Sequence, residues 1–172
     1  MGHRALYVVM GVSGSGKSVI GSRLARALGL EFVEGDSYHS SENVARMSAG
    51  IPLTDADRQA WLAAIAARLD AARRAGVGLV VSCSALKRSY RDVLRAGRAD
   101  IQFVCLQGDR ALIDQRLADR RGHFMPSSLL DSQFAILEPP SADEDAWVCD
   151  ISQPPDVIVA HLVECSLSRR VR

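Results

Sequence analysis

The chain has 172 residues, 48% of them hydrophobic and 24% charged, which is long enough to bury a core and short enough for one domain. Its 21 Lys and Arg residues against 20 Asp and Glu residues leave a formal net charge of +1, which excludes a general electrostatic attraction to nucleic acid or acidic lipid. We therefore expect a single domain over residues 1–172, with no nucleic acid and no membrane as partner.

Short apolar runs alternate along the chain with stretches whose apolar residues recur every three or four positions. The runs predict strands at 5–10, 31–33, 78–83, 101–106 and 147–151. The periodic stretches predict helices at 17–28, about 55–74, 86–95, 111–121, 128–137 and 155–168. This alternation favours a parallel sheet covered on both faces. We predict the α/β class, as a three-layer α/β/α sandwich with a mainly parallel five-stranded sheet.

The four cysteines show no pattern of a disulfide framework or a zinc site. Cys83, Cys105, Cys149 and Cys165 are scattered, and the first three lie in or beside apolar strand-like runs. We expect buried thiols in a reducing compartment. No apolar run approaches the ~20 residues that span a bilayer, and the run at 5–10 leads straight into a glycine loop rather than a signal-peptide cleavage site. A cytoplasmic location is the expectation.

A glycine-rich segment follows the first predicted strand and opens the first predicted helix. It matches the pattern Gly-x-x-x-x-Gly-Lys-Ser through Gly11, Gly16, Lys17 and Ser18. In this context backbone N–H groups turn inward around a polyanion. Lys17 is placed to reach the β- and γ-phosphates of a nucleoside triphosphate, and the Ser18 hydroxyl to ligate Mg²⁺. The other candidate phosphate contacts in this loop are Ser13, Gly14 and Ser15.

The sequence argues against GTP as the nucleotide. Guanine specificity usually involves a segment Asn-Lys-x-Asp, which the chain lacks. Residues 119–122 spell the Asp-x-x-Gly of GTPase switches, but they lie in or after a basic helix rather than at a strand end. One phosphate loop without an appended domain favours a metabolite kinase over a motor ATPase.

Two carboxylates and an imidazole follow the second predicted strand, at Glu34, Asp36 and His39. The carboxyl end of a strand beside the phosphate loop is where α/β sheets bind substrates. Asp36 is placed to orient or deprotonate an attacking hydroxyl, and Glu34 to hold a water of the Mg²⁺ shell. The alternative interpretation is a polar turn that caps the next helix.

With these residues in place, the chain resembles the gluconokinase family of small P-loop kinases, which is related in architecture to shikimate and adenylate kinases. The resemblance covers nearly the whole chain. Besides the generic phosphate loop it rests on more specific blocks: Gly35-Asp36 with His39, Asn43 and Met47; Pro52-Leu53-Thr54-Asp55 with Asp57-Arg58 and Trp61-Leu62; Cys83-Ser84-Ala85-Leu86-Lys87 with Tyr90-Arg91-Asp92; and Gly122-His123-Phe124 with Gln133-Phe134.

The resemblance implies a P-loop kinase that uses ATP and Mg²⁺ to phosphorylate D-gluconate on its 6-hydroxyl. It implies a homodimer, an acceptor-binding region at about 36–60, and a helical lid at about 120–128. A polyol with a carboxylate calls for cations and for hydrogen-bonding side chains. The resembling blocks offer the following acceptor contacts: Asp36, His39, Asn43, Arg58, Ser84, Lys87, Arg91, His123 and Gln133.

Arg116 and Arg120 stand four residues apart and would share one face of a helix. In the related kinases, arginines at such positions stack on adenine and reach the phosphates. The resemblance therefore implies that both arginines bind the nucleotide, and that Arg120 acts in catalysis together with Lys17 and Asp36. A basic solvated helix is the alternative.

Several other proposed ligand contacts have an alternative interpretation. Arg58 and Arg91 have aspartates nearby with which they could pair on solvated helices, and Lys87 could lie along apolar surface. His39 and His123 could be ordinary surface or core histidines. From the resemblance we expect aspartate in many relatives where this chain has Glu34. For the whole protein, the alternatives are a sibling kinase acting on shikimate or another sugar acid, and a nucleotide-binding regulatory module without transfer.

Overall fold

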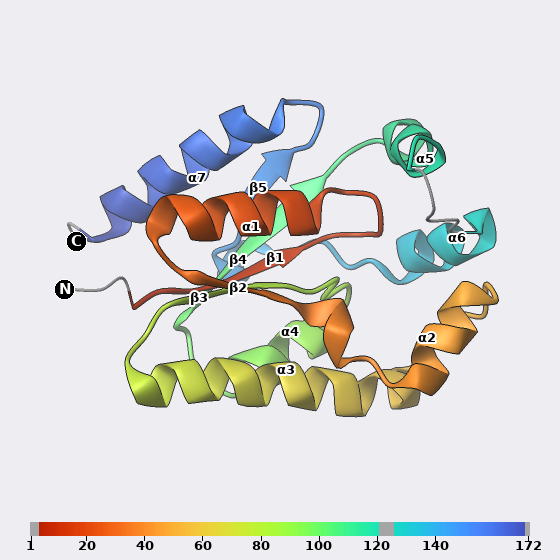
Figure 1. The fold of residues 1–172 in the computed structure, drawn as a ribbon, viewed down its shortest axis with the longest axis horizontal. Helices are drawn as coiled ribbons and strands as arrows, with labels where there is room; N and C mark the ends of the chain where they lie inside the picture. Colours follow the sequence, from red (N-terminus) through yellow and green to blue (C-terminus); the bar gives the residue numbers. More distant parts are fainter. Residues whose placement is uncertain (1–3, 121–125, 171–172) are drawn as a thin grey trace.

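A parallel β-sheet forms the centre of the protein (Figure 1). The computed structural model describes residues 4–120 and 126–170. The strands are β1 (Leu6–Met10), β2 (Glu31–Glu34), β3 (Leu79–Ser82), β4 (Ile101–Gln107) and β5 (Trp147–Asp150), in the spatial order β2-β3-β1-β4-β5. Every neighbouring pair is parallel. The carboxyl ends of the strands therefore lie along one edge of the sheet, where α/β proteins bind ligands.

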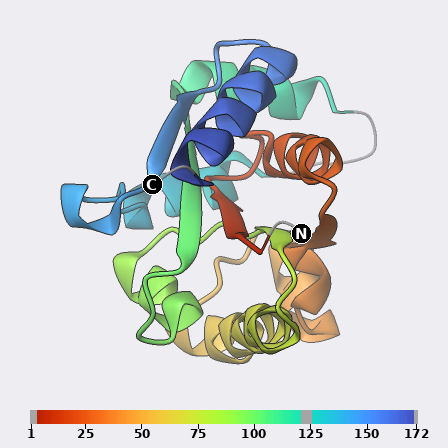
Figure 2. The same ribbon diagram turned by 90° about the vertical axis from the view of Figure 1, so that its left-hand side faces the viewer.

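Helices cover both faces of this sheet (Figures 1 and 2). On one face lie α1 (Lys17–Leu28) and α7 (Pro155–Arg170), and on the other α3 (Asp55–Ala75) and α4 (Arg88–Arg95). At the carboxyl end of the strands lie α2 (Ser41–Ser48), α5 (Arg110–Ala118) and α6 (Ser127–Ile136). Two short 3-10 turns are η1 (Gly35–Tyr38) and η2 (Ala142–Glu144). The three-layer prediction is confirmed, and the described sheet is parallel throughout.

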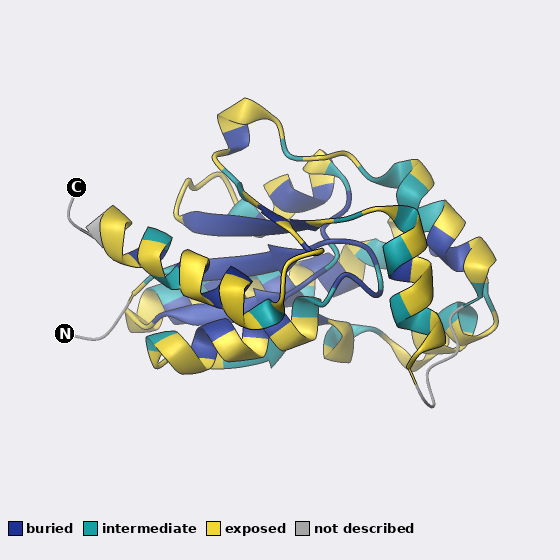
Figure 3. Cartoon of the chain, turned by 90° about the horizontal axis from the view of Figure 1, so that it is seen from above, coloured by how far each residue is buried: buried dark blue, intermediate teal, exposed yellow. Residues whose placement is uncertain are grey.

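The sheet divides the core into two apolar layers, and buried residues concentrate on its strands (Figure 3). Val8 and Phe103 enter the layer beneath α3 and α4, whereas Val9 and Val104 enter the layer beneath α1 and α7. None of the four has exposed surface. Successive residues of a strand point to opposite faces. Both faces are covered, which is why these strands are apolar without alternation.

Helices α2, α4 and α5 differ from the sequence prediction, and α5 ends at Ala118 rather than at residue 121. α4 begins at Arg88 rather than at residue 86, because Lys87, its N-cap residue, has an extended backbone with φ of −101° and ψ of 149°. α2 was not predicted. Asn43 is its only buried residue, so the apolar period that reveals a helix is missing. Ser40 starts α2, because its side chain accepts the N–H of Asn43.

The expected lid at about 120–128 falls mainly on residues 121–125, which lie outside the described residues, and residues 127 and 128 already belong to α6. Cys83, Cys105 and Cys149 are buried as expected, and Cys165 is half-buried; all four are free thiols. In the part of the chain that the structure describes, no helix combines the length and apolar character needed to cross a membrane.

Candidate active site

The phosphate loop, residues 11–18, links β1 to α1 at the carboxyl edge of the sheet. Two of its glycines are required by the backbone. Gly14 has a φ of 81°, and a Cβ there would lie 2.8 Å from Cγ of Leu117 on α5. Gly16 has a φ of 98° and immediately precedes Lys17, the first residue of α1. These conformations turn the chain sharply into α1, whose first N–H groups are available to an anion.

Two segments outside the loop hold it by hydrogen bonds. The N–H of Gly11 donates to the carbonyl of Ser84 at 3.3 Å. On α6, Gln133 accepts the N–H of Ser13 at Oε1, at 2.8 Å, and donates from Nε2 to Oγ of Ser13 at 3.1 Å. Ser84 and Gln133 were both predicted to bind the acceptor. In the structure both contact the phosphate loop.

Lys17 lies at the centre of the charged groups of the site. Its Nζ donates to the carbonyl of Val12 at 3.0 Å. Burial lowers the pKa of Lys17, Arg120 lowers it further, and the carboxylates of Asp36 and Glu34 oppose that shift. These three side chains are therefore close enough to act on the ammonium group. The predicted catalytic residues Lys17, Asp36 and Arg120 share one region of the structure.

Oxygen atoms suited to Mg²⁺ gather at the start of α1. The hydroxyl of Ser18 donates to Oε2 of Glu34, and Oε1 of the same carboxylate accepts from Oγ of Ser82 at 2.5 Å. In the described residues, no group of three or more His, Cys, Asp or Glu side chains could hold a metal alone. Mg²⁺ is usually bound by one or two protein groups together with substrate phosphates. The hydroxyl and carboxylate fit that mode of binding.

The turn that carries Asp36 is held from two sides. The N–H of Gly35 donates to Oγ of Ser82 at 3.3 Å, and the carbonyl of Gly35 accepts from Nε1 of Trp61 on α3 at 2.8 Å. A Cβ at Gly35 would lie 2.0 Å from the carbonyl oxygen of Ser82, so only glycine fits this close approach to β3. The Asp36 side chain is exposed. A carboxylate on a fixed turn is suited to orient a hydroxyl of a bound acceptor.

His39 stacks on Trp61, with ring centroids 4.2 Å apart and an interplanar angle of 14°. Its Nδ1 is buried and has no hydrogen-bond partner among the described residues. Burial lowers the pKa of His39, with Asp36 opposing and Arg58 assisting that shift. Burial therefore favours the neutral form of His39, which is suited to hydrogen-bond a hydroxyl rather than to attract an anion by charge.

Two cations flank the ring of Tyr90 on α4. Cζ of Arg58 lies 5.6 Å and Nζ of Lys87 lies 5.7 Å from the ring centroid. Arg58 donates to the Tyr90 hydroxyl at 3.2 Å and to the Leu53 carbonyl at 2.6 Å, and Lys87 pairs with Asp55 at 3.0 Å. Burial and a hydrogen bond to Asp55 raise the pKa of Tyr90 to about 12. Two cations held this way suit a carboxylate ligand.

Two of the predicted acceptor contacts are engaged elsewhere. Asn43 is buried, and its Nδ2 donates to the carbonyl of Asp57 at 2.8 Å, which ties α2 to α3. Arg91 is 0% exposed, pairs with Glu144 at 2.6 Å, and donates to the carbonyl of Ala85 at 2.9 Å. A buried guanidinium with these partners does not fit direct contact with an acceptor. His123 lies outside the described residues.

A cavity of about 290 Å³ opens beside the phosphate loop, and Arg116 and Arg120 both line it. Its other walls come from the loop and from the turn between β5 and α7, including Ile151, Gln153 and Pro155. The guanidinium of Arg116 donates to the carbonyl of Ile151. The position suits the base of a nucleotide whose phosphates lie in the loop. The sequence did not predict that the β5–α7 turn lines this cavity, because Gln-Pro-Pro indicates a turn but not what the turn binds.

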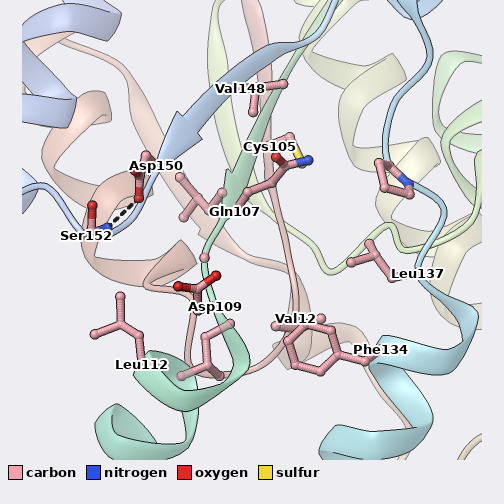
Figure 4. Close-up of a pocket in the computed structure, with 14 residues that line it drawn as sticks. Val12, Cys105, Gln107, Asp109, Leu112, Phe134, Leu137, Val148, Asp150 and Ser152 are labelled. Atoms are coloured by element: carbon pink, nitrogen blue, oxygen red, sulfur yellow. Dashed lines mark hydrogen bonds between the residues drawn. The ribbon is translucent and has the colours of Figure 1, made fainter.

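A larger cavity of about 570 Å³ lies between the ends of β4 and β5 and helices α5 and α6 (Figure 4). Gln107, Asp109 and Asp150 contribute polar groups to it, while Val12 and Phe134 are among its apolar walls. Of the predicted site residues that the structure describes, none lines this cavity. It touches the phosphate loop through Val12.

Comparison with known proteins gives the family. A family model described as AAA domain matches residues 6–140. The chain is 48% identical to the gluconokinase of Gluconobacter oxydans over 156 residues, covering 91% of this chain and 88% of the relative. It is 44% identical to the thermoresistant gluconokinase of Escherichia coli K12 over 160 residues, covering 92% of this chain and 91% of that relative. The chain belongs to the gluconokinase family.

A crystal structure of a gluconokinase from Sinorhizobium meliloti 1021 matches this fold with a TM-score of 0.87 and 48% identity, covering 98% of this chain and 94% of that chain. The family resemblance predicted from the sequence blocks is confirmed. Membership of the gluconokinase family, together with the phosphate loop, makes the protein a P-loop kinase that uses ATP.

Proposed function

We propose that the protein transfers the γ-phosphoryl group of ATP to the 6-hydroxyl of D-gluconate, giving 6-phospho-D-gluconate and ADP. The observation that carries the proposal is the match to named gluconokinases over 91% and 92% of the chain. The arrangement of the side chains supports it. The phosphate loop, the carboxylate of Asp36 and the cations Arg58 and Lys87 all lie at the carboxyl end of the sheet.

On the donor side, the phosphate loop and Lys17 bind the triphosphate, and the cavity lined by Arg116 and Arg120 takes the base. Ser18 and Glu34 would hold Mg²⁺, which would neutralise charge on the phosphates. Lys17 and Arg120 stabilise the charge that develops on the transferred group.

On the acceptor side, Arg58 and Lys87 bind the gluconate carboxylate, and neutral His39 hydrogen-bonds a hydroxyl of the chain. Asp36 accepts the proton of the 6-hydroxyl of gluconate. The oxygen of that hydroxyl bonds to the γ-phosphorus while the bond between the γ-phosphorus and the leaving oxygen of ADP breaks. Positioning of the two reactants in line supplies much of the catalysis.

A panel of acceptors tests the proposal. ADP release is measured by a coupled assay with D-gluconate, shikimate and other sugar acids, and the product is examined by NMR for phosphate on C6. We expect ADP release that depends on gluconate. An active alternative acceptor beside inactive gluconate would assign the enzyme to a sibling substrate. Binding of ATP without any acceptor-dependent ADP release would indicate a regulatory module.

A further inference from the structure

Gln133 contacts the phosphate loop through both polar atoms of its side chain. Its Oε1 accepts the N–H of Ser13, and its Nε2 donates to the hydroxyl of the same residue. The reverse orientation of the amide would set an NH₂ group against the Ser13 N–H. The two bonds together therefore require a glutamine amide in this one orientation.

The helix that carries Gln133 is anchored in the core. Leu129 and Leu130 of α6 are 3% and 0% exposed. The ring of Phe134, the next residue after Gln133, packs in the same core layer as Val12, which precedes Ser13, and both line the cavity in Figure 4. α6 is therefore a fixed support beside the loop rather than a surface helix that follows it.

Ser13 lies in the loop between two residues that each make a specific contact. The residue before it, Val12, accepts the hydrogen bond from Nζ of Lys17, and the residue after it, Gly14, packs against Leu117 of α5. A shift of Ser13 therefore moves the carbonyl that holds Lys17. Since the N–H of Ser13 is donated to Gln133, phosphate binding falls to later amides, including those at the start of α1.

We propose that Gln133 is a positioning residue for the nucleotide, which holds the phosphate loop in shape through Ser13 and does not contact the acceptor. This inference deepens the proposed function and rests on it for the identity of the reaction. It replaces the prediction from sequence that Gln133 binds gluconate. The two roles differ in a measurable way, because one acts on ATP and the other on the acceptor.

The test uses Gln133→Met, which keeps the length of the side chain and removes both hydrogen bonds, with Gln115→Met on the exposed side of α5 as the matched control. Affinity for MgADP is measured by calorimetry without acceptor, and KM is measured for each substrate. We expect Gln133→Met to weaken ADP binding and raise the KM for ATP about tenfold, with a lower kcat. The KM for gluconate stays within about twofold, and Gln115→Met matches the wild type.

Ser13→Ala completes a double-mutant cycle. It removes the hydroxyl but keeps the N–H, so we expect a smaller loss of ADP affinity than in Gln133→Met. The double variant is expected to resemble Gln133→Met, because the two changes remove the same contact. Circular dichroism checks that each variant is folded.

Several results would overturn the proposal. One is a raised KM for gluconate with unchanged ADP affinity in Gln133→Met, which would place Gln133 on the acceptor. Others are unchanged constants in that variant, or simple additivity in the cycle. If wild-type protein fails to phosphorylate gluconate, the proposed function fails, while the ADP affinities still decide the role of Gln133.

Discussion

The hydroxyl of Ser82 connects Glu34, which we propose to act at the Mg²⁺ site, to the turn that carries Asp36. It donates to Oε1 of Glu34 and accepts the N–H of Gly35, the residue before Asp36. If Ser18 were to bind Mg²⁺ instead of donating to Glu34, Ser82 would still orient the Glu34 carboxylate. Ser82 in this way positions both the carboxylate of Glu34 and the turn that carries Asp36.

Ser82→Ala is therefore expected to raise the Mg²⁺ concentration needed for half-maximal activity about 10- to 100-fold, the usual effect of losing such a supporting group. The measurement is the rate against free Mg²⁺ at saturating ATP and gluconate. Ser166→Ala, which removes another buried hydroxyl far along α7, serves as the control for general destabilisation. An unchanged Mg²⁺ requirement in Ser82→Ala would show that Glu34 needs no such support.

Asp36→Asn tests the proton acceptor. The amide keeps the shape of the side chain but cannot take a proton at neutral pH, so we expect kcat to fall about 10²- to 10⁴-fold. ADP affinity should change little, because Asp36 lies on the acceptor turn. Asp100→Asn, at an exposed carboxylate that pairs with the largely buried side chain of Arg73, is the matched control. Turnover near that of the wild type in Asp36→Asn would remove Asp36 from the mechanism.

At single positions, sequence reasoning identified the residues of the phosphate loop, because their spacing has a direct physical meaning. It missed Ser82, since one serine at the end of a strand has no pattern around it. It misplaced Arg91, which belongs to a family block but pairs with Glu144, 53 residues away. An arginine in a motif predicts an anion, and the sequence alone does not say whether that anion is a ligand or a buried carboxylate.

At the scale of elements, Arg91 connects α4 to the segment that borders the phosphate loop. Its Nη1 donates to the carbonyls of Ala85 and Leu86, directly after Ser84, whose carbonyl holds Gly11. The left-handed φ of 44° at Ala85 is uncommon for a residue with a side chain. Arg91 thus stabilises the segment between β3 and α4.

Arg91→Met is expected to lower the free energy of unfolding by about 3–5 kcal/mol, because it leaves the carboxylate of Glu144 buried without its main partner. Urea unfolding followed by circular dichroism measures this change. The double variant Arg91→Met with Glu144→Met removes both charges and should recover most of the loss. A double variant no more stable than Arg91→Met would show that the hydrogen bonds to the backbone, rather than the unpaired charge, dominate.

The ion pair between Arg91 and Glu144 makes the free energy of unfolding depend on pH. The hydrogen bond from Arg91 lowers the pKa of Glu144 from 4.5 to about 2. Because the folded pKa lies below the unfolded one, the contribution of this carboxylate is complete above about pH 4.5 and is lost as the pH falls toward about 2. The difference in unfolding free energy between wild type and Glu144→Gln should shrink over that window. A difference that is constant with pH would contradict the ion pair.

At the scale of the whole molecule, the layered fold was predictable because buried parallel strands and amphipathic helices have different periods. The sheet order then brings β2, β3 and β1 together, so that Glu34, Ser82 and the phosphate loop meet although they are distant in sequence. The close contacts that result, such as Trp61 with the carbonyl of Gly35, depend on tertiary packing. Local sequence carries no signal for them.

Burial of the charged Lys17 side chain at this edge of the sheet lowers the stability of the folded protein. Burial lowers the pKa of Lys17, which means that the folded protein disfavours its charged form. Lys17→Met is therefore expected to abolish turnover and to raise the free energy of unfolding at neutral pH by about 0.5–2 kcal/mol. Denaturant unfolding and the ADP-release assay measure the two effects on the same preparation.

The pH dependence distinguishes this explanation from a general packing effect. Since the folded pKa of Lys17 lies below its unfolded value of 10.5, the folded protein releases this proton at a lower pH than the unfolded chain, and wild-type stability rises with pH until about pH 10.5. The advantage of Lys17→Met should therefore be largest near neutrality and shrink as the pH approaches about 10.5. A variant that is less stable than the wild type at neutral pH would mean that Asp36 and Glu34 more than offset the burial of the ammonium group.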